Sequence, residues 1–275
     1  MEMPGARRVP WIAAAFLATL ALASAAPPAR ASGDMTMEYR ATAFVTGNDL
    51  RYRAYGFGLC LRDVLVKLSG EPRLDRDPRV AELMTRAGTM IKSYYYIDPK
   101  SVIPHRDDQA SYDRSHYLTV TFDRTAIDRA LKALGERPWR GERPTVIPAI
   151  TVRGASGSYL LSSESAAAAD QRASFALLAS DYDLKVRVPT EAELASWGIP
   201  MGWFPSPQVS STPEQVILVG SLAFDPATPG WSGSWRMLWQ GEAYAWSIQG
   251  VNYDGAFRNA LKGTLRIVSG HGGPE

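Results

Sequence analysis

The feature that most limits how this chain can fold is a run of ten residues near its middle, Gly135-Glu-Arg-Pro-Trp-Arg-Gly-Glu-Arg-Pro144. Its two prolines, two glycines and five charged side chains interrupt both helix and strand. The run divides the chain into two stretches of plausible domain size. We therefore expect two folded units, residues 38–137 and residues 143–270, followed by a flexible tail at residues 271–275.

Helices and strands are interspersed in the first unit. Alternating apolar residues predict strands at residues 39–45, 94–97 and 116–122. Apolar residues at three- and four-residue spacing predict helices at residues 54–68, 78–91 and 127–134. Ser69-Gly70 ends the first helix, because glycine adopts the left-handed conformation there without a clash. Asp77 caps the second, and Pro78 is at a position where its missing N–H costs nothing.

The second unit uses the same kinds of element in another order. The pattern predicts strands at residues 146–152, 184–188 and 216–224, and a hairpin of residues 234–239 and 243–249. Helices are predicted at residues 170–180, from a capping box of Thr190 and Glu193, and at residues 257–268. Interspersed helices and strands in both halves predict an α+β protein of two layered αβ units.

The first 31 residues are typical of a cleavable secretion signal rather than of a folded segment. Two arginines precede an uncharged apolar stretch, residues 11–26, and Ala29 and Ala31 place small residues before the expected cleavage site. We expect cleavage before Ser32, with cleavage after Ala25 as the alternative. An uncleaved anchor is a further alternative, but a membrane span needs about 20 strongly apolar residues and this stretch is short and half alanine.

Charge and cysteine content limit the partners and the chemistry. The chain has 30 Lys and Arg against 28 Asp and Glu, and the leader holds Arg7, Arg8, Arg30 and Glu2. The remainder is therefore neutral, so charge gives no argument for a nucleic acid or an anionic membrane as partner. The single cysteine, Cys60, cannot form an intramolecular disulfide, and the fold must be stable through core packing alone.

The run Asp63-Val-Leu-Val-Lys-Leu-Ser-Gly-Glu-Pro-Arg73, followed by Asp77-Pro-Arg-Val80, is the most distinctive motif of the chain. Weaker motifs follow at Leu118–Asp123, Pro138-Trp139, Arg143-Pro144, Val219-Gly220, Trp235–Trp239 and Phe257–Leu261. Together they resemble a bacterial secreted family known as domain of unknown function two thousand and sixty-six. The resemblance implies a secreted Gram-negative protein and supplies no catalytic residues. The second unit is also similar to accessory domains of outer-envelope assembly proteins, which implies a partner-binding role.

The densest polar segment is Pro104–His116, whose side chains could in principle hold a metal. Its candidate ligands are His105, Asp107, Asp108, Asp113 and His116. Their spacing matches neither a calcium loop nor a zinc signature, and two arginines among them would compete for the acids. We expect a solvated polar loop and no metal site.

No residue set specifies a reaction. Cys60 falls on the buried stripe of the first predicted helix, where a thiol has a raised pKa and is inert. The chain contains no Gly-x-Ser-x-Gly pattern, and Gly56-Phe-Gly58 has no third glycine to form a phosphate loop. We therefore assign no catalytic residue and no cofactor.

Aromatic residues provide the candidate binding site. The segment Trp197–Pro207 is apolar without helical or strand periodicity, so it either folds onto the domain or forms a contact surface. The candidate binding residues are Trp197, Met201, Trp203, Phe204 and Trp231. In the hairpin, Trp235, Met237, Trp239 and Trp246 share one face, which we interpret as packing on the last helix. The alternative is an exposed platform for sugar rings or a partner chain.

These observations favour a periplasmic, non-enzymatic accessory protein that binds an envelope protein or a cell-wall component. The alternative is a cell-envelope hydrolase or glycan-binding enzyme whose carboxylates converge only in the folded chain, with Asp107, Asp108 and Asp113 as candidates. A deep pocket lined by carboxylates of shifted pKa would favour the enzyme. The sequence does not fix the oligomeric state.

Overall fold

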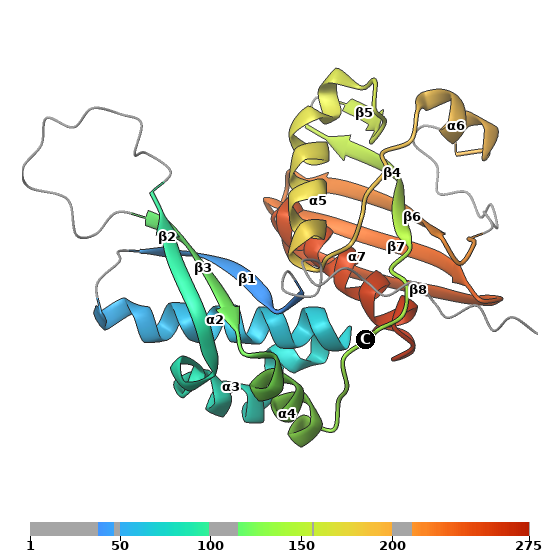
Figure 1. Cartoon of the computed structure of the whole chain (residues 1–275). Coiled ribbons are helices and arrows are strands. Elements are labelled where there is room, and N and C mark those ends of the chain that lie inside the picture. The colour runs from blue at the N-terminus through green and yellow to red at the C-terminus, as the bar shows by residue number, and fades with distance from the viewer. Residues whose placement is uncertain (1–37, 47–49, 99–114, 156, 200–210, 275) are drawn as a thin grey trace, which may run out of the picture. The chain divides into compact units, whose positions relative to one another are not determined.

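The computed structural model describes residues 38–46, 50–98, 115–155, 157–199 and 211–274 (Figure 1). Its helices accompany two β-sheets, one of three strands and one of five. This arrangement confirms the predicted α+β class. Across these ranges, no helix combines the length and the apolar character that crossing a bilayer requires.

The three-stranded sheet is antiparallel and has the order β1-β3-β2. Its strands are β1 (Arg40–Thr46), β2 (Ile91–Ile97) and β3 (Ser115–Phe122). The helical elements of this unit are α2 (Leu50–Ser69), η1 (Pro72–Arg76), α3 (Pro78–Thr85), η2 (Ala87–Met90) and α4 (Arg124–Leu134). Successive strand residues point to opposite faces. Ala43, Leu118 and Val120 are accordingly buried on the face that packs against α2.

Helix α2 packs its apolar side against the three-stranded sheet and the neighbouring helical elements of this unit. Leu61, Val64 and Leu65 are fully buried, as their three- and four-residue spacing predicts. Gly70 follows the helix with a φ of +77°, which glycine adopts without a side-chain clash. The carboxylate of Asp77 accepts a hydrogen bond from the Arg79 backbone and caps α3. The predicted end of α2 at Ser69-Gly70 and the predicted start of α3 at Asp77-Pro78 are therefore both confirmed.

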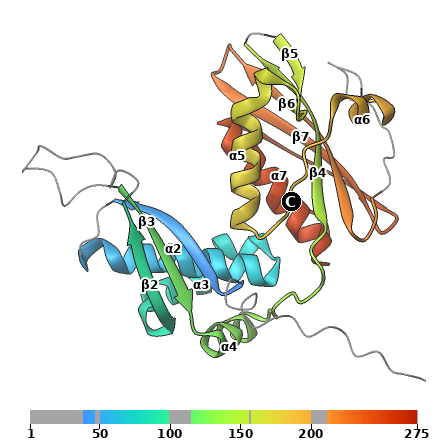
Figure 2. The same ribbon diagram turned by 45° about the horizontal axis from the view of Figure 1, so that its top comes forward.

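The five-stranded sheet has the order β5-β4-β6-β7-β8. Its strands are β4 (Thr145–Gly154), β5 (Gly157–Leu160), β6 (Gln215–Asp225), β7 (Gly230–Trp239) and β8 (Glu242–Val251). Strands β4 and β6 are parallel, and the other neighbours are antiparallel. The helical elements are η3 (Ala166–Ala168), α5 (Ala169–Asp181), α6 (Glu191–Ser196) and α7 (Tyr253–Val268). Helices α5 and α7 lie side by side on one face of this sheet (Figure 2).

The tryptophan-rich face of the β7–β8 hairpin packs on α7, as predicted. Trp235 and Trp246 are opposite each other in the hairpin register and both are buried. The Trp235 indole N–H donates to Asn259 Oδ1 at 3.0 Å, and the Trp246 indole N–H donates to the Asn259 carbonyl oxygen at 3.3 Å. A buried indole needs such a partner for its N–H. These tryptophans are therefore core residues and not an exposed platform.

Helix α6 covers part of the opposite face of the five-stranded sheet. Thr190 and Glu193 form the predicted capping box, in which each side chain accepts a hydrogen bond from the other residue's backbone N–H. Leu194 packs with Ile147 and Ile217 in a second, smaller apolar cluster. This sheet is thus covered on both faces within the described residues.

Two predictions of local structure are wrong. Residues 184–188 alternate in polarity but form only an isolated parallel bridge, between Val186 and Val146. The segment meets β4 at this one point, and Pro189 follows without a backbone N–H to continue the ladder. Ile91, expected at the end of the second helix, begins β2 instead, because α3 ends at Thr85 and the short 3-10 helix η2 intervenes.

The segment Gly135–Pro144 contains neither helix nor strand, as predicted, but it is held in place. The Trp139 backbone N–H donates to the Leu68 carbonyl oxygen at 2.7 Å, and the Arg143 guanidinium lies 4.4 Å from the centre of the Trp139 ring. Residues 32–275 form one compact unit, and its principal core includes residues from both sheets. Independent folding of the two predicted domains stays a prediction.

Candidate functional site

Most of the predicted aromatic contact surface lies outside the described residues, namely Met201, Trp203 and Phe204. Trp197 follows α6 and packs, partly buried, against the small apolar cluster on the sheet. Trp231 lies on β7, with its ring 5.4 Å from Phe224 and 6.1 Å from Tyr253. Trp197 and Trp231 thus pack against two different apolar clusters, and their role in binding stays a prediction.

The predicted polar loop also falls largely outside the described residues, including His105, Asp107, Asp108 and Asp113. His116 is described and is buried on β3. Its ring meets the edge of Tyr96 at a centroid distance of 6.0 Å. His116 therefore contributes to the packing of the three-stranded sheet.

The single thiol is buried, as the helical spacing predicts. Cys60 has no exposed surface, and its Sγ lies 3.7 Å from the Leu118 carbonyl oxygen. Burial raises the pKa of Cys60 to about 12. Because the thiolate is the nucleophilic form, this cysteine is inert at neutral pH.

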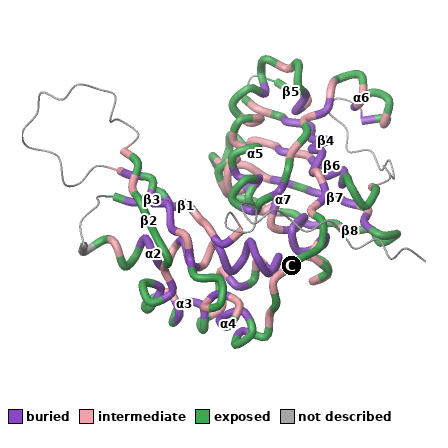
Figure 3. The backbone as a smooth tube through the Cα atoms, in the orientation of Figure 1, coloured by how far each residue is buried: buried purple, intermediate pink, exposed green. Residues whose placement is uncertain are grey.

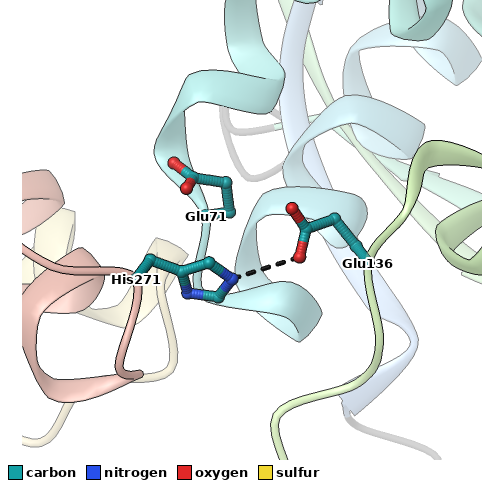
Figure 4. A group of neighbouring side chains, drawn as sticks. All are labelled: Glu71, Glu136 and His271. Carbon is teal, nitrogen blue, oxygen red and sulfur yellow. Dashed lines mark hydrogen bonds and ion pairs between the residues drawn. The ribbon is translucent and has the colours of Figure 1, made fainter.

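A polar cluster that local sequence does not reveal joins Glu71, Glu136 and His271 (Figure 4). Glu71 precedes η1, Glu136 follows α4 and His271 follows α7. One ligand atom from each lies within 4.8 Å of the others, and His271 Nε2 is 3.1 Å from Glu136 Oε2. A neutral nitrogen and two carboxylate oxygens are a donor set that suits zinc.

Two similar helix ends bring these residues together. Helices α2 and α7 both end at a Ser-Gly pair, Ser69-Gly70 and Ser269-Gly270, and both glycines have positive φ. The two ends meet, since Ser269 Oγ lies 2.9 Å from the Gly70 carbonyl oxygen and 2.9 Å from His271 Nδ1. A Cβ added at Gly70 would lie 2.4 Å from the Ser269 Cβ, so this contact requires glycine.

Arg266 connects the cluster to the end of the chain. Its guanidinium pairs with Glu71 and donates to the carbonyl oxygens of His271 at 2.7 Å and Gly273 at 2.9 Å. The segment from residue 271, expected to be a flexible tail, is thus hydrogen-bonded to α7 at His271 and Gly273. Burial alone would raise the pKa of Glu71, but hydrogen bonds from Arg73 and Arg266 hold it below its usual value.

The same arginines decide what the cluster can do chemically. Arg73 and Arg266 both contact Glu71 Oε2, so a metal ion would have to displace a guanidinium from that carboxylate. The cluster is therefore an ion-pair and hydrogen-bond network that fastens α7 to η1. None of the three cluster residues stands out in the sequence, although the repeated Ser-Gly helix end is a signal that could have pointed to their meeting.

A polar pocket of about 510 Å³ is lined by the acids Asp63, Asp75 and Asp181 and by the cations Arg62, Arg76, Arg258 and Lys262. Burial raises the pKa of Asp63 and of Asp181. Each of these two acids faces a cation, Arg62 at 2.9 Å from Asp63 and Arg258 at 3.6 Å from Asp181. Carboxylates of raised pKa thus do line a pocket, although they are not those of the predicted loop.

The outer face of the three-stranded sheet carries exposed apolar side chains. The register places Phe44 of β1 and Ile97 of β2 on either side of Tyr117 of β3, with Tyr95 in the next row. Their exposed fractions are 60% for Phe44, 49% for Ile97, 44% for Tyr117 and 47% for Tyr95. We call these four residues the aromatic face. Strand β2 is exposed along much of its length (Figure 3).

Comparison with known proteins gives one family match. Residues 35–140 match the family described as Domain of unknown function (DUF8605). The match covers the three-stranded sheet with its helices and ends at Arg140, inside the Gly135–Pro144 segment. The expected membership in domain of unknown function two thousand and sixty-six is therefore wrong, because its motif run Asp63–Arg73 lies within the range of a different family. No curated protein and no solved structure matches the chain.

Proposed function

We propose that this chain is a secreted periplasmic protein without catalytic activity, which binds another protein of the cell envelope through the aromatic face. The observation that carries the proposal is the row of Phe44, Tyr117 and Ile97 across three strands, exposed on the outer side of the sheet. A contiguous exposed apolar patch bordered by polar residues often marks a site of protein–protein interaction.

The chemistry of this face favours a protein partner. The residues that share it are Arg40, Thr42, Phe44, Thr46, Ser93, Tyr95, Ile97, Ser115, Tyr117, Thr119 and Thr121. Arg40 is the one charged residue among them, and a single positive charge is too little to hold a polyanion. It also lacks the carboxylate and amide side chains that would fix the hydroxyl groups of a sugar. An uncharged apolar surface of another protein is the complementary partner.

The leader supports the proposed compartment. A positive start, an apolar stretch and small residues before Ser32 form the pattern of a signal that directs export and is then removed. The N-terminal residue of the protein purified from cells tests this part. Ser32, or Ala26 for the alternative site, is expected in the periplasmic fraction, and Met1 in the cytosolic fraction would overturn it.

Site-specific photo-cross-linking in living cells tests the binding role. A photoreactive phenylalanine at position 117 should give a discrete cross-linked product that contains a second envelope protein, identified by mass spectrometry. The same group at position 177 is a matched control, because Leu177 is 68% exposed on α5 and far from this sheet in sequence. A third probe at position 203 tests the predicted aromatic loop separately.

The product from position 117 should disappear when Phe44→Glu places a charge beside it. Because Phe44 is exposed, this substitution leaves the core intact. The proposal is overturned by a product that persists in Phe44→Glu, by a product equally strong from position 177, or by a product that contains only this chain or glycan.

A second candidate, a cell-envelope hydrolase, is favoured by the pocket that Asp63, Asp75 and Asp181 line. A carboxyl group of raised pKa can act as a general acid beside an ionised one. Release of reducing ends or peptides from purified cell wall tests it. Activity that Asp63→Asn and Asp181→Asn each abolish would establish the hydrolase, and equal rates for both variants and the unchanged chain would exclude it.

A further inference from the structure

A second pocket, of about 600 Å³, lies between η1 with the start of α3 on one side and α7 on the other. Five cationic side chains line it, Arg73, Arg76, Arg79, Lys262 and Arg266. The carboxylates that line it are Asp75 and Asp77. In a chain that is neutral beyond its leader, this pocket is a local concentration of positive charge.

The internal ion pairs neutralise only part of this charge. Lys262 pairs with Asp75, and Arg79 pairs with Asp77 at 2.6 Å. Arg73 and Arg266 both pair with the carboxylate of Glu71. Among the described residues, the acids that meet these five cations are Asp75, Asp77 and Glu71.

Arg76 is the cation of this pocket that pairs with no acid among the described residues. Its side chain is exposed, and no ion pair or hydrogen bond of its side chain occurs within the part of the chain that the structure describes. Arg76 lines both this pocket and the neighbouring pocket of Asp63, Asp75 and Asp181, so it lies between the two. Its guanidinium is available to a bound molecule.

We propose that the pocket between η1 and α7 binds a ligand through a phosphoryl group. A phosphomonoester carries about −1.5 to −2 charges at neutral pH, and Arg76 offers it a guanidinium that no acid among the described residues neutralises. Guanidinium groups hold such a group through paired hydrogen bonds, and four of the five cations are arginines. This inference does not depend on the aromatic face, because that face is formed by β1, β2 and β3 and the pocket by η1, α3 and α7.

The remaining walls set the kind of molecule that carries the phosphoryl group. Pro72, Pro78, Pro274 and Gly263 add uncharged surface to the pocket. Gly263 cannot be replaced by a larger residue without moving Trp246, whose indole would lie 2.5 Å from an added Cβ. The volume is within the range of about 300–1,000 Å³ typical of small-molecule sites, so the phosphoryl group has room for an organic substituent.

Calorimetric titration of the full chain with phenyl phosphate tests the proposal, with benzoate as a monoanionic analogue and phenol as an uncharged one. Phenyl phosphate should bind, benzoate at least about tenfold more weakly, and phenol not at all. Arg76→Ala should weaken phenyl phosphate binding about tenfold or more, because a charge-assisted contact is lost. Arg129→Ala is the matched control, since Arg129 is an exposed arginine of α4 outside the pocket.

A second arm distinguishes a free ligand from a lipid headgroup. It measures co-sedimentation with phosphatidylcholine vesicles that do or do not contain phosphatidic acid, a lipid with a phosphomonoester. Binding in either arm that Arg76→Ala weakens and Arg129→Ala leaves unchanged supports the proposal, and the responding arm names the source. It is overturned if neither probe binds, if both variants behave alike, or if benzoate binds as tightly as phenyl phosphate.

Discussion

Glu71 and Arg266, which are 195 residues apart in the sequence, form a buried ion pair between η1 and α7. Only 4% of the Glu71 side chain and 9% of the Arg266 side chain are exposed. Removing one partner leaves the other charge buried without a counter-ion, which costs about 3–5 kcal/mol. We expect Glu71→Ala to lower the free energy of unfolding by about this amount in urea denaturation.

The half-exposed pair of Arg258 and Asp181 provides the control for this prediction. Its charged atoms are 3.6 Å apart, and about half of each side chain is in solvent. A pair of this kind contributes less than about 1 kcal/mol, so Arg258→Met should have a small effect. Equal losses of stability in Glu71→Ala and Arg258→Met would show that the buried pair does not hold α7 to η1.

Lys67 makes stability depend on alkaline pH. Burial lowers the pKa of Lys67 from 10.5 to about 8. Between these values the unfolded chain binds more protons than the folded chain, so this group makes stability rise from about pH 8 to pH 10.5. Below about pH 8 the buried, charged Lys67 lowers the free energy of unfolding by its full cost of roughly 3 kcal/mol. The unfolding free energy of the unchanged chain minus that of Lys67→Met should therefore rise by up to this amount from about pH 8 to pH 10.5.

This difference isolates Lys67 from other groups that titrate in the same range. Burial raises the pKa of Tyr39 and of Tyr182, and a raised pKa of an acidic group makes stability fall with pH. Both tyrosines are present in the two proteins compared, so their contributions cancel. A difference that stays constant from pH 7 to pH 11 would contradict the prediction.

Trp235 lies against a glycine of the neighbouring strand. A Cβ added at Gly220 would lie 2.5 Å from Trp235 Cε3, and Ile150 packs on the other side at 3.2 Å. Overpacking of a core costs about 1–3 kcal/mol, so Gly220→Ala should lower the melting temperature clearly. Gly88→Ala is the matched substitution in open space, with Phe57 Cδ2 at 3.9 Å as the nearest atom, and it should be tolerated. Similar melting temperatures for the two variants would contradict the close contact between Gly220 and Trp235.

The cluster of Glu71, Glu136 and His271 gives a prediction about zinc. Because Arg73 and Arg266 already hold the Glu71 carboxylate, we expect the same melting temperature with zinc and with EDTA. His271→Ala removes the nitrogen ligand and serves as the control. A zinc-dependent rise in melting temperature that His271→Ala abolishes would instead make this cluster a metal site.

Local features of the fold could be predicted from the sequence because neighbouring residues decide them. The apolar stripe of α2, the cap at Asp77 and the capping box of Thr190 and Glu193 each depend on a few adjacent positions. Residues 184–188 also alternate, but strand formation needs a partner, and β4 offers one at a single position. Pattern alone cannot supply that partner.

The sites could not be predicted in the same way. Glu136 and His271 are 135 residues apart, and the pocket between η1 and α7 joins residues that are even farther apart. Nothing in the sequence near Arg76 indicates that Lys262 and Arg266 approach it. The aromatic face was missed for a related reason, because Phe44, Ile97 and Tyr117 become one row only through the strand order β1-β3-β2.

The position of α7 at the end of the chain has a consequence for the timing of folding. This sixteen-residue helix packs under β7 and β8 and also supplies the cations that reach η1. Because α7 follows both sheets in the sequence, its contacts with β7, β8 and η1 cannot form until residue 268 has been synthesised. The five-stranded sheet and η1 therefore gain these contacts last, after the strands of both sheets have been made.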